Sequence, residues 1–209
     1  MKPSNSDSAH APAAQPGTRE RLVVAMQAAL RRTGYHGVGL NELLAQANAP
    51  KGVLYHHFAG GKTELALAAI ALTVQQLEAG LDKVLARSAN PAQALGVWLN
   101  AGQKLLATSG FEHGCPLAAI GLESTPEDQA IRVAVAAGFA SIRTKLESCL
   151  QQAGVAPARA RQLAALVVST YEGALLQARV AGRVDAMRDA CAALLDFVQL
   201  SLPTQAHTS

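Results

Sequence analysis

The spacing of the apolar residues is the feature that most limits what this chain can fold into. Over long stretches Ala, Leu and Val recur every three or four residues, which places them on one face of an α-helix. Clusters of β-branched residues with the two-residue alternation of a half-buried strand are missing. With 50% hydrophobic residues in a length of 209, the chain can bury a substantial core. The sequence therefore predicts an all-α protein.

Residues that start, stop or turn helices divide this pattern into segments. Helices are predicted over residues 18–33, 40–47, 50–58, 63–87, 91–108, 115–123, 126–153, 157–181 and 185–202. Four of them start at the prolines at positions 50, 91, 126 and 157, because proline suits the first turn, where its missing N–H would be unpaired anyway. Thr18 and Gly39 can serve as N-caps, and Asn48 can take the left-handed conformation after the second segment. A sharp turn is therefore expected between the second and third helices.

The third predicted helix has two different faces. Leu54 and Phe58 lie four residues apart and can anchor it to the first two helices. Lys51 and Tyr55 lie on the opposite face, which is basic, aromatic and hydrogen-bonding. Two helices joined by a tight turn, the second with such a face, have the geometry that enters the DNA major groove. Any three-helix bundle gives similar spacing, so the pattern alone also allows these side chains to decorate a surface.

Positive charge gathers in the same part of the chain. Residues 17–62 hold six cations and two anions, a net charge of +4, whereas residues 63–209 have a net charge of −1. A basic segment attached to a near-neutral body fits a domain that meets phosphate groups. A solvated charged face is the alternative interpretation.

The stretch over residues 37–65 resembles the DNA-binding signature of the TetR family. In that signature Lys-Gly is followed by Leu-Tyr-His-His-Phe and then by Lys-x-x-Leu, and this chain has Lys-Gly-Val-Leu-Tyr-His-His-Phe at 51–58 and Lys-Thr-Glu-Leu at 62–65. It departs at Gly39, where Ser or Thr is usual, at Asn48, where Gly is usual, and in an additional glycine at 59–61. Only Gly39 bears on DNA binding, because it removes a hydroxyl group that could contact phosphate.

Two further stretches, Gly-Cys-Pro-Leu-Ala-Ala at 114–119 and Glu-Gly-Ala-Leu-Leu at 172–176, are similar to the LmrA/YxaF-like branch, which represses efflux or detoxification genes in response to small aromatic compounds. The resemblance implies a three-helix helix-turn-helix DNA-binding domain over residues 18–64 and a helical effector-binding and dimerisation domain over 65–203. Residues 1–17, rich in Ser, Ala and Pro, are predicted to be a disordered tail. The expected function is repression by a homodimer on a pseudo-palindromic operator in double-stranded DNA, relieved by a small aromatic or apolar effector.

Residues of the first domain are assigned to DNA from this resemblance and their positions. Lys51 and Tyr55 are expected to bind phosphates and nearby base edges, and Val53 to touch a thymine methyl group. Helix N-termini near Thr18 and Lys62 can face the sugar-phosphate backbone. The full predicted DNA-binding set is Thr18, Gly39, Asn41, Lys51, Gly52, Val53, Tyr55, His56, His57 and Lys62.

The second domain is expected to pair subunits and to hold the effector. The resemblance implies pairing through the last two helices, with a predicted dimer interface of Leu163, Val167, Ala174, Ala178, Leu194, Leu195 and Val198. Aromatic residues make up only 4% of the chain, so the few large ones in this domain are taken to mark a pocket. The predicted effector-binding residues are Trp98, Gln103, Phe111, His113, Cys115, Phe139 and Tyr171. For both sets an ordinary intrachain core is the alternative.

Several classes of protein are disfavoured. No apolar run approaches a membrane span, and residues 1–17 lack the apolar region of a signal peptide, so a cytoplasmic protein without a membrane partner is expected. Cys115, Cys149 and Cys191 have neither disulfide nor zinc spacing, and His56 and His57 point about 100° apart on a helix and make poor co-ligands. No metal site and no cofactor are predicted.

Three rival functions remain. An enzyme built on His113, Cys115 and Glu123 lacks base-orienting spacing and any cofactor motif, so no catalytic residues are predicted. A redox-responsive regulator that uses a cysteine thiol would change only the signal. A sequence-independent DNA-coating protein would not discriminate between operator and random duplex.

Overall fold

Nine α-helices make up the regular structure of the residues that the computed structural model describes, which are 17–88 and 90–203. They are α1 (Thr18–Thr33), α2 (Leu40–Gln46), α3 (Val53–His57), α4 (Gly61–Leu85), α5 (Pro91–Thr108), α6 (Pro116–Glu123), α7 (Gln129–Gln152), α8 (Pro157–Ala181) and α9 (Asp185–Ser201). This part of the chain contains no strand, so the all-α prediction is confirmed. The predicted disordered tail lies outside the described residues except for Gly17.

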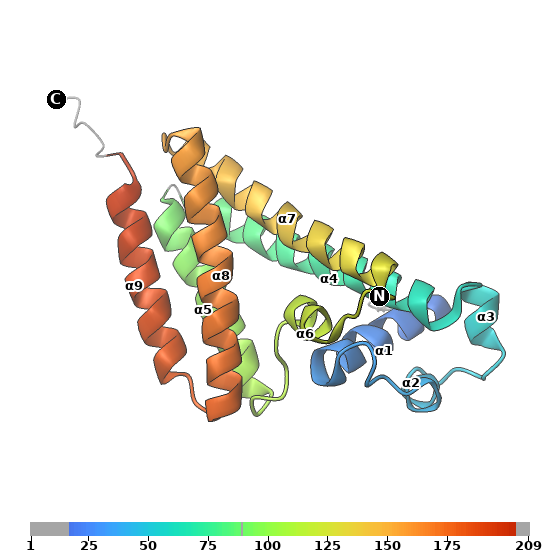
Figure 1. Cartoon of the computed structure of the whole chain (residues 1–209). Helices are drawn as coiled ribbons and strands as arrows, with labels where there is room; N and C mark the ends of the chain where they lie inside the picture. The colour runs from blue at the N-terminus through green and yellow to red at the C-terminus, as the bar shows by residue number, and fades with distance from the viewer. Residues whose placement is uncertain (1–16, 89, 204–209) are drawn as a thin grey trace, which may run out of the picture.

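The helices form two groups joined by α4 (Figure 1). The short helices α2 and α3 lie with α1 at one end of the molecule, while α5, α8 and α9 stand together at the other. Helix α4 packs on α1 near its start and runs along α7, and α7 in turn packs on α8. Helix α6 lies between the groups, in contact with both α1 and α7. A direct contact also joins the two groups, because the Arg179 side chain of α8 donates a hydrogen bond to the Arg32 backbone carbonyl of α1 at 3.2 Å.

Several predicted helix boundaries are confirmed and others are wrong. The helices predicted over 18–33, 91–108 and 157–181 have those bounds. The third helix begins at Val53 rather than Pro50, because the Pro50 carbonyl accepts a hydrogen bond from the Val53 N–H three residues on, at 3.0 Å, and forms a turn there. The seventh begins at Gln129 rather than Pro126, because the Asp128 N–H closes a turn onto the Thr125 carbonyl at 3.1 Å.

Some of the predicted helix caps are confirmed and one is wrong. Gly39 is the N-cap of α2, and Asn48 has the left-handed φ of 47° that its position predicted. Thr18 is not a cap: Gly17 takes that place, and the Thr18 Oγ1 accepts a hydrogen bond from the Arg21 side chain at 3.1 Å. Asn90, which sequence reasoning missed, caps α5 by accepting from the backbone N–H groups of Ala92 and Gln93.

The core takes up most of the residues predicted for the dimer interface. Six of the seven are no more than 4% exposed within the single chain, so they have no surface left to bury against a second subunit; they are Leu163, Val167, Ala174, Ala178, Leu194 and Val198. Only Leu195 is half-buried, and it packs near Gly96 of α5. The prediction was wrong for these six because α8 lies between α7 and α9, which use its most apolar stripes.

Helix α4 is, by length and composition alone, apolar enough to cross a membrane; it is the single such helix within residues 17–88 and 90–203. Its contacts explain the composition differently. It packs against α1, α5 and α7, and Leu65, Ala69 and Leu81 are fully buried there. The apolar sequence of α4 is therefore that of a core helix.

A buried polar contact fixes α1 on α4. Gln27 is 7% exposed, and its side-chain amide donates to the Thr73 hydroxyl at 3.0 Å and to the side-chain oxygen Oε1 of Gln76 at 2.7 Å. The Thr73 hydroxyl in turn donates to the Ala69 carbonyl at 2.9 Å. Buried polar groups that satisfy one another define the register of two helices more sharply than apolar contacts do.

Removing this amide should destabilise the protein. Gln27→Ala is expected to lower the free energy of unfolding by about 1–2 kcal/mol, because it breaks two hydrogen bonds and leaves a buried hydroxyl short of a donor. Urea denaturation followed by circular dichroism measures the change. Gln46→Ala, on the exposed face of α2, is the control and should leave stability unchanged within about 0.5 kcal/mol. Equal stability of the two variants would contradict the assigned role of Gln27.

Candidate functional site

The turn between α2 and α3 is set by backbone hydrogen bonds at the end of α2. The Ala49 N–H donates to the Leu44 carbonyl at 2.9 Å, and Asn48 between them has a positive φ. This arrangement closes the end of a helix and turns the chain sharply. Lys51 and Gly52, which follow Pro50, are exposed before α3 begins. The turn therefore presents the start of α3 outward from the bundle.

Two residues hold α3 against the rest of the domain, as predicted. Leu54 is 1% exposed and Phe58 is fully buried, with the Arg19 guanidinium 5.1 Å from the Phe58 ring centre. On the other side Tyr55 is 62% exposed. Gly61 has a φ of +63°, and a Cβ there would lie 3.2 Å from the Tyr55 ring, so glycine suits this turn into α4.

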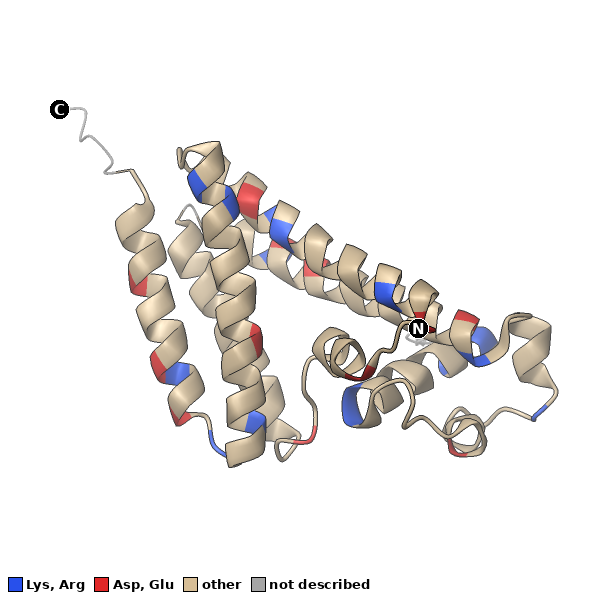
Figure 2. Ribbon diagram, in the orientation of Figure 1, with Lys and Arg blue, Asp and Glu red and all other residues tan. Residues whose placement is uncertain are grey.

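The predicted DNA-binding residues differ in how freely they can meet a partner. Six are exposed: Gly39, Asn41, Lys51, Gly52, Tyr55 and His56. Thr18, Val53, His57 and Lys62 are half-buried. Helix α3 itself carries no Lys, Arg, Asp or Glu (Figure 2), so the cation nearest to it in sequence is Lys51. The exposed surface of α3 is thus built from aromatic, imidazole and backbone groups rather than from a row of charges.

Lys62 faces the body of the domain. Its ammonium group lies 4.9 Å from the centre of the Tyr35 ring, a cation–π contact. Partial burial lowers the pKa of this lysine, and the Glu123 carboxylate opposes that shift. The Lys62 side chain therefore packs on the loop between α1 and α2, through its contact with Tyr35.

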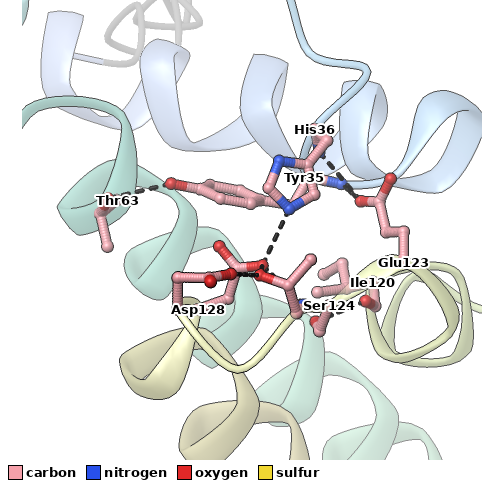
Figure 3. Close-up of polar contacts among 9 residues, drawn as sticks. Tyr35, His36, Thr63, Ile120, Glu123, Ser124 and Asp128 are labelled. Carbon is pink, nitrogen blue, oxygen red and sulfur yellow. Dashed lines mark hydrogen bonds and ion pairs between the residues drawn. The ribbon is translucent and has the colours of Figure 1, made fainter.

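The end of α6 holds that loop in place. The Glu123 carboxylate accepts hydrogen bonds from the backbone N–H groups of Tyr35 and of His36, the latter at 3.0 Å (Figure 3). Gly34 makes this possible, since it has a φ of +66° and a Cβ there would collide with the carboxylate. We call this contact, with the Asp128–His36 contact beside it, the α6 clasp.

The second half of the α6 clasp comes from the turn between α6 and α7. Asp128 Oδ2 lies 2.8 Å from His36 Nε2 and also accepts from the Thr125 N–H at 2.8 Å. The Thr125 backbone and then the His36 ring lower the pKa of the Asp128 carboxyl group. The Tyr35 hydroxyl reaches Thr63 of α4 at 2.9 Å. The loop that leads into α2 is therefore tied to both α4 and α6.

Two adjoining cavities lie behind α6. The larger, of about 350 Å³, is lined mainly by α6 and α8 and includes Ala118, Ala119, Leu122 and Phe139. The smaller, of about 60 Å³, reaches Trp98 and Tyr171, whose ring centres are 5.5 Å apart. Both cavities share the lining residues Gly114, Cys115, Glu172 and Leu175. An apolar chamber with a narrower inner end suits a small organic ligand.

The predicted effector residues are only partly brought together. Trp98, His113 and Tyr171 line the smaller cavity, Phe139 lines the larger, and Cys115 lines both. Phe111 lies in a separate depression with Arg32 and Val180, and Gln103 lines neither cavity. Five of the seven predicted residues therefore line the two cavities, and the other two do not.

Sequence reasoning missed the most unusual group in these walls, Glu172. Burial raises the pKa of its carboxyl group to about 7, and the neighbouring Cys115 thiol opposes this shift. Its Oε2 atom is buried without a partner. The stretch containing Glu172 was used for the family resemblance, but the neighbours that bury it are distant in sequence.

Burial disfavours the thiolate form of all three cysteines. Burial raises the pKa of Cys115 strongly, and it also raises the pKa of Cys149 and Cys191. Oxidants attack the thiolate form, which burial disfavours. No group of three His, Cys, Asp or Glu side chains that could hold a metal ion occurs within the described ranges.

Comparison with known proteins identifies the family. Residues 24–69 match the family described as "Bacterial regulatory proteins, tetR family", and residues 91–193 match "Transcriptional regulator LmrA/YxaF-like, C-terminal domain". An uncharacterized HTH-type transcriptional regulator of Mycobacterium tuberculosis is 32% identical over 169 residues, which cover 78% of this chain and 85% of the relative. The chain belongs to the TetR family of transcriptional regulators.

Solved structures of TetR regulators have the same fold. The regulatory protein TetR from Rhodobacter sphaeroides superimposes with a TM-score of 0.77 at 25% identity, covering 86% of this chain and 97% of that one. The TetR regulator CifR, solved as a cysteine mutant bound to a 26-base-pair operator duplex, gives a TM-score of 0.73 at 19% identity over 91% and 100% of the two chains. The predicted fold class and the LmrA/YxaF-like branch are confirmed, and the chain is a transcriptional regulator rather than an enzyme.

The raised pKa of Glu172 predicts a pH-dependent stability. In the unfolded chain a glutamate titrates near 4.5, so folding favours the protonated form, and its contribution is lost as the pH rises from about 4.5 through about 7. Glu172→Gln should therefore stabilise the protein by up to about 3 kcal/mol at pH 8 and by little at pH 4.5. Urea titrations at both pH values measure this, with exposed Glu112→Gln as the control. A stabilisation independent of pH would contradict the assignment.

Proposed function

We propose that this TetR regulator is a ligand-responsive repressor that binds a pseudo-palindromic operator as a dimer. The observation that carries the proposal is the exposed surface around the start of α3, presented by a tight turn and anchored by Leu54 and Phe58. TetR regulators bind operator DNA as dimers, and CifR, which shares the fold, was solved on an operator duplex. The same arrangement is proposed here.

The exposed residues have different proposed roles in binding DNA. Lys51 supplies the positive charge for phosphate, and Gly52 beside it has no atom within 4 Å of where a Cβ would stand, so its backbone is open to close approach. Tyr55 and His56 follow on the exposed side of α3 and are placed to reach base edges. Gly39 and Asn41 are exposed at the first turn of α2, and there they are proposed to meet neighbouring phosphates.

Dimerisation is proposed through the faces of α8 and α9 that the core leaves uncovered. These faces carry large apolar residues exposed to solvent: Leu166, Leu176, Val180, Phe197 and Leu200. Leu200 is 85% exposed and Val180 is 81% exposed, which is costly for a monomer in water. Pairing these faces from two subunits would place two copies of α3 on half-sites about 34–36 Å apart, or a multiple of this.

The link between effector and DNA is proposed to run through α6. One part of this helix, Ala118 to Leu122, lines the larger cavity, and the next residue, Glu123, holds the loop before α2. A ligand that displaces α6 must therefore strain or break the α6 clasp. If the α6 clasp is released, α2 and α3 are no longer held at the spacing between half-sites that the operator needs. Repression would then be relieved.

Substitutions on the exposed surface test DNA binding. Tyr55→Ala should weaken operator binding by about 1–3 kcal/mol, and Lys51→Ala should weaken it and reduce the salt dependence of log K by about one unit. Fluorescence anisotropy with the protein's own upstream DNA measures both. Lys104→Ala, which removes an exposed cation from α5, is the matched control. Unchanged affinity of the first two variants would refute the proposed interface, and an operator preference under about 10³ over random duplex would favour a DNA-coating role.

Substitution of Glu123 tests the link through α6. Glu123→Ala should weaken operator binding about tenfold, because the loss of two backbone hydrogen bonds leaves the DNA-binding helices less well positioned before they meet DNA. The dimer should persist, as measured by analytical ultracentrifugation. Glu112→Ala makes the same change of charge at an exposed site and should bind like the wild type. Wild-type operator affinity of Glu123→Ala would show that the α6 clasp does not position the DNA-binding helices.

A further inference from the structure

Two residues that line the same cavity each have a buried polar atom without a hydrogen-bond partner. Among the described residues, Arg31 Nε and Glu172 Oε2 are the two buried side-chain atoms left in this state. Both residues line the smaller cavity, and their side chains do not form an ion pair with each other. A buried donor or acceptor without a partner destabilises the folded state. Two such groups in one small cavity therefore point to a molecule that satisfies both.

The two groups need different hydrogen-bond partners. Arg31 Nε is a donor only and needs an acceptor, such as a carbonyl oxygen. Glu172 Oε2 has no partner and needs an N–H or O–H donor when the carboxyl group is ionised. The matching partner carries one acceptor and one donor on a compact head group.

The rest of the site describes the body of the ligand. The smaller cavity, about 60 Å³, has room for a head group of a few atoms. It adjoins the 350 Å³ cavity, whose wall is formed by Ala118, Ala119 and Phe139 together with leucines and glycines. A flat apolar or aromatic body fits there, and its burial supplies most of the binding energy.

Resting on the proposed effector function, we infer that the effector is an uncharged amphiphile whose head group, of the amide class, bridges Arg31 Nε and Glu172 Oε2 while its apolar body fills the larger cavity. Arg31 belongs to the last turn of α1, so such a ligand contacts the DNA-binding domain directly as well as α8. A cationic head would leave Arg31 unpaired beside a second positive charge. An anionic head would face the Glu172 carboxylate.

Four naphthalene probes of nearly equal size test this inference on the full chain. They are 2-naphthamide (donor and acceptor), 2-acetonaphthone (acceptor), 2-naphthylmethylamine (cationic donor) and 2-naphthoate (anion). Isothermal titration calorimetry at pH 7.5 should give the highest affinity for 2-naphthamide, about tenfold above the ketone, because one hydrogen bond to a charged group separates them. Equal or higher affinity for the amine or the acid would overturn the inference.

Two variants assign the contacts. Glu172→Met keeps the length of the side chain, Arg31→Met shortens it, and each variant replaces the polar end with an apolar thioether that needs no hydrogen-bond partner. Thermal denaturation verifies that both variants retain the fold. Both variants should bind 2-naphthamide about tenfold more weakly than the wild type, whereas only Arg31→Met should bind 2-acetonaphthone more weakly. Arg32→Met, whose guanidinium instead pairs with Glu42 at 3.7 Å, is the matched control. Unchanged affinity for 2-naphthamide in either test variant, or no binding to the wild type, would mean that ordered water fills the cavity and the inference is wrong.

The inference and the proposed function can fail separately. If 2-naphthamide binds as described but leaves operator binding unchanged, the contacts stand and the proposed coupling through α6 fails. If 2-naphthamide does not bind, the inference fails, while the Tyr55 and Glu123 variants still decide the proposed function.

Discussion

The Glu123 carboxylate accepts hydrogen bonds from two consecutive backbone N–H groups, and the arrangement of the DNA-binding helices depends on this contact. The contact joins residues 87 and 88 positions apart, so it forms only when α6 lies across the end of α1. It also requires glycine at position 34, because a side chain there would occupy the place of the carboxylate. One hydrogen-bond acceptor thus fixes the loop that leads into α2, and α2 with its turn fixes α3.

The rest of the molecule supports this contact from both sides. The Gln27 amide and the Tyr35 hydroxyl tie the DNA-binding helices to α4, while Asp128 holds the same loop from the start of α7. On the far side, α6 forms a wall of the cavity in which Glu172 and Arg31 lack partners. A ligand in this cavity would contact both α6 and the end of α1. Helix α6 therefore lines the cavity with Ala118, Ala119 and Leu122 and holds the loop before α2 with the next residue, Glu123.

Local patterns in the sequence predicted what local interactions decide. The spacing of Leu54 and Phe58 predicted the anchored face of α3, and Asn48 predicted the left-handed turn before it. The prediction of the dimer residues was wrong because their burial depends on contacts between distant parts of the chain. Leu163 and Val198 carry the apolar period of a buried face, but that period does not say whether the same chain or a partner covers it. Glu123 and Glu172 gave no local signal, because each acquires its role from residues distant in the chain.

Hydrogen–deuterium exchange of the α1–α2 loop tests the central claim most directly. In the absence of DNA and ligand, the account predicts that peptides covering residues 34–47 exchange at least about tenfold faster in Glu123→Ala than in the wild type, because two hydrogen bonds that protect the loop are lost. Peptides from α8 and α9 should exchange as in the wild type, and Glu112→Ala should match the wild type throughout. Unchanged protection of residues 34–47 in Glu123→Ala would contradict the claim that α6 holds the DNA-binding helices in place.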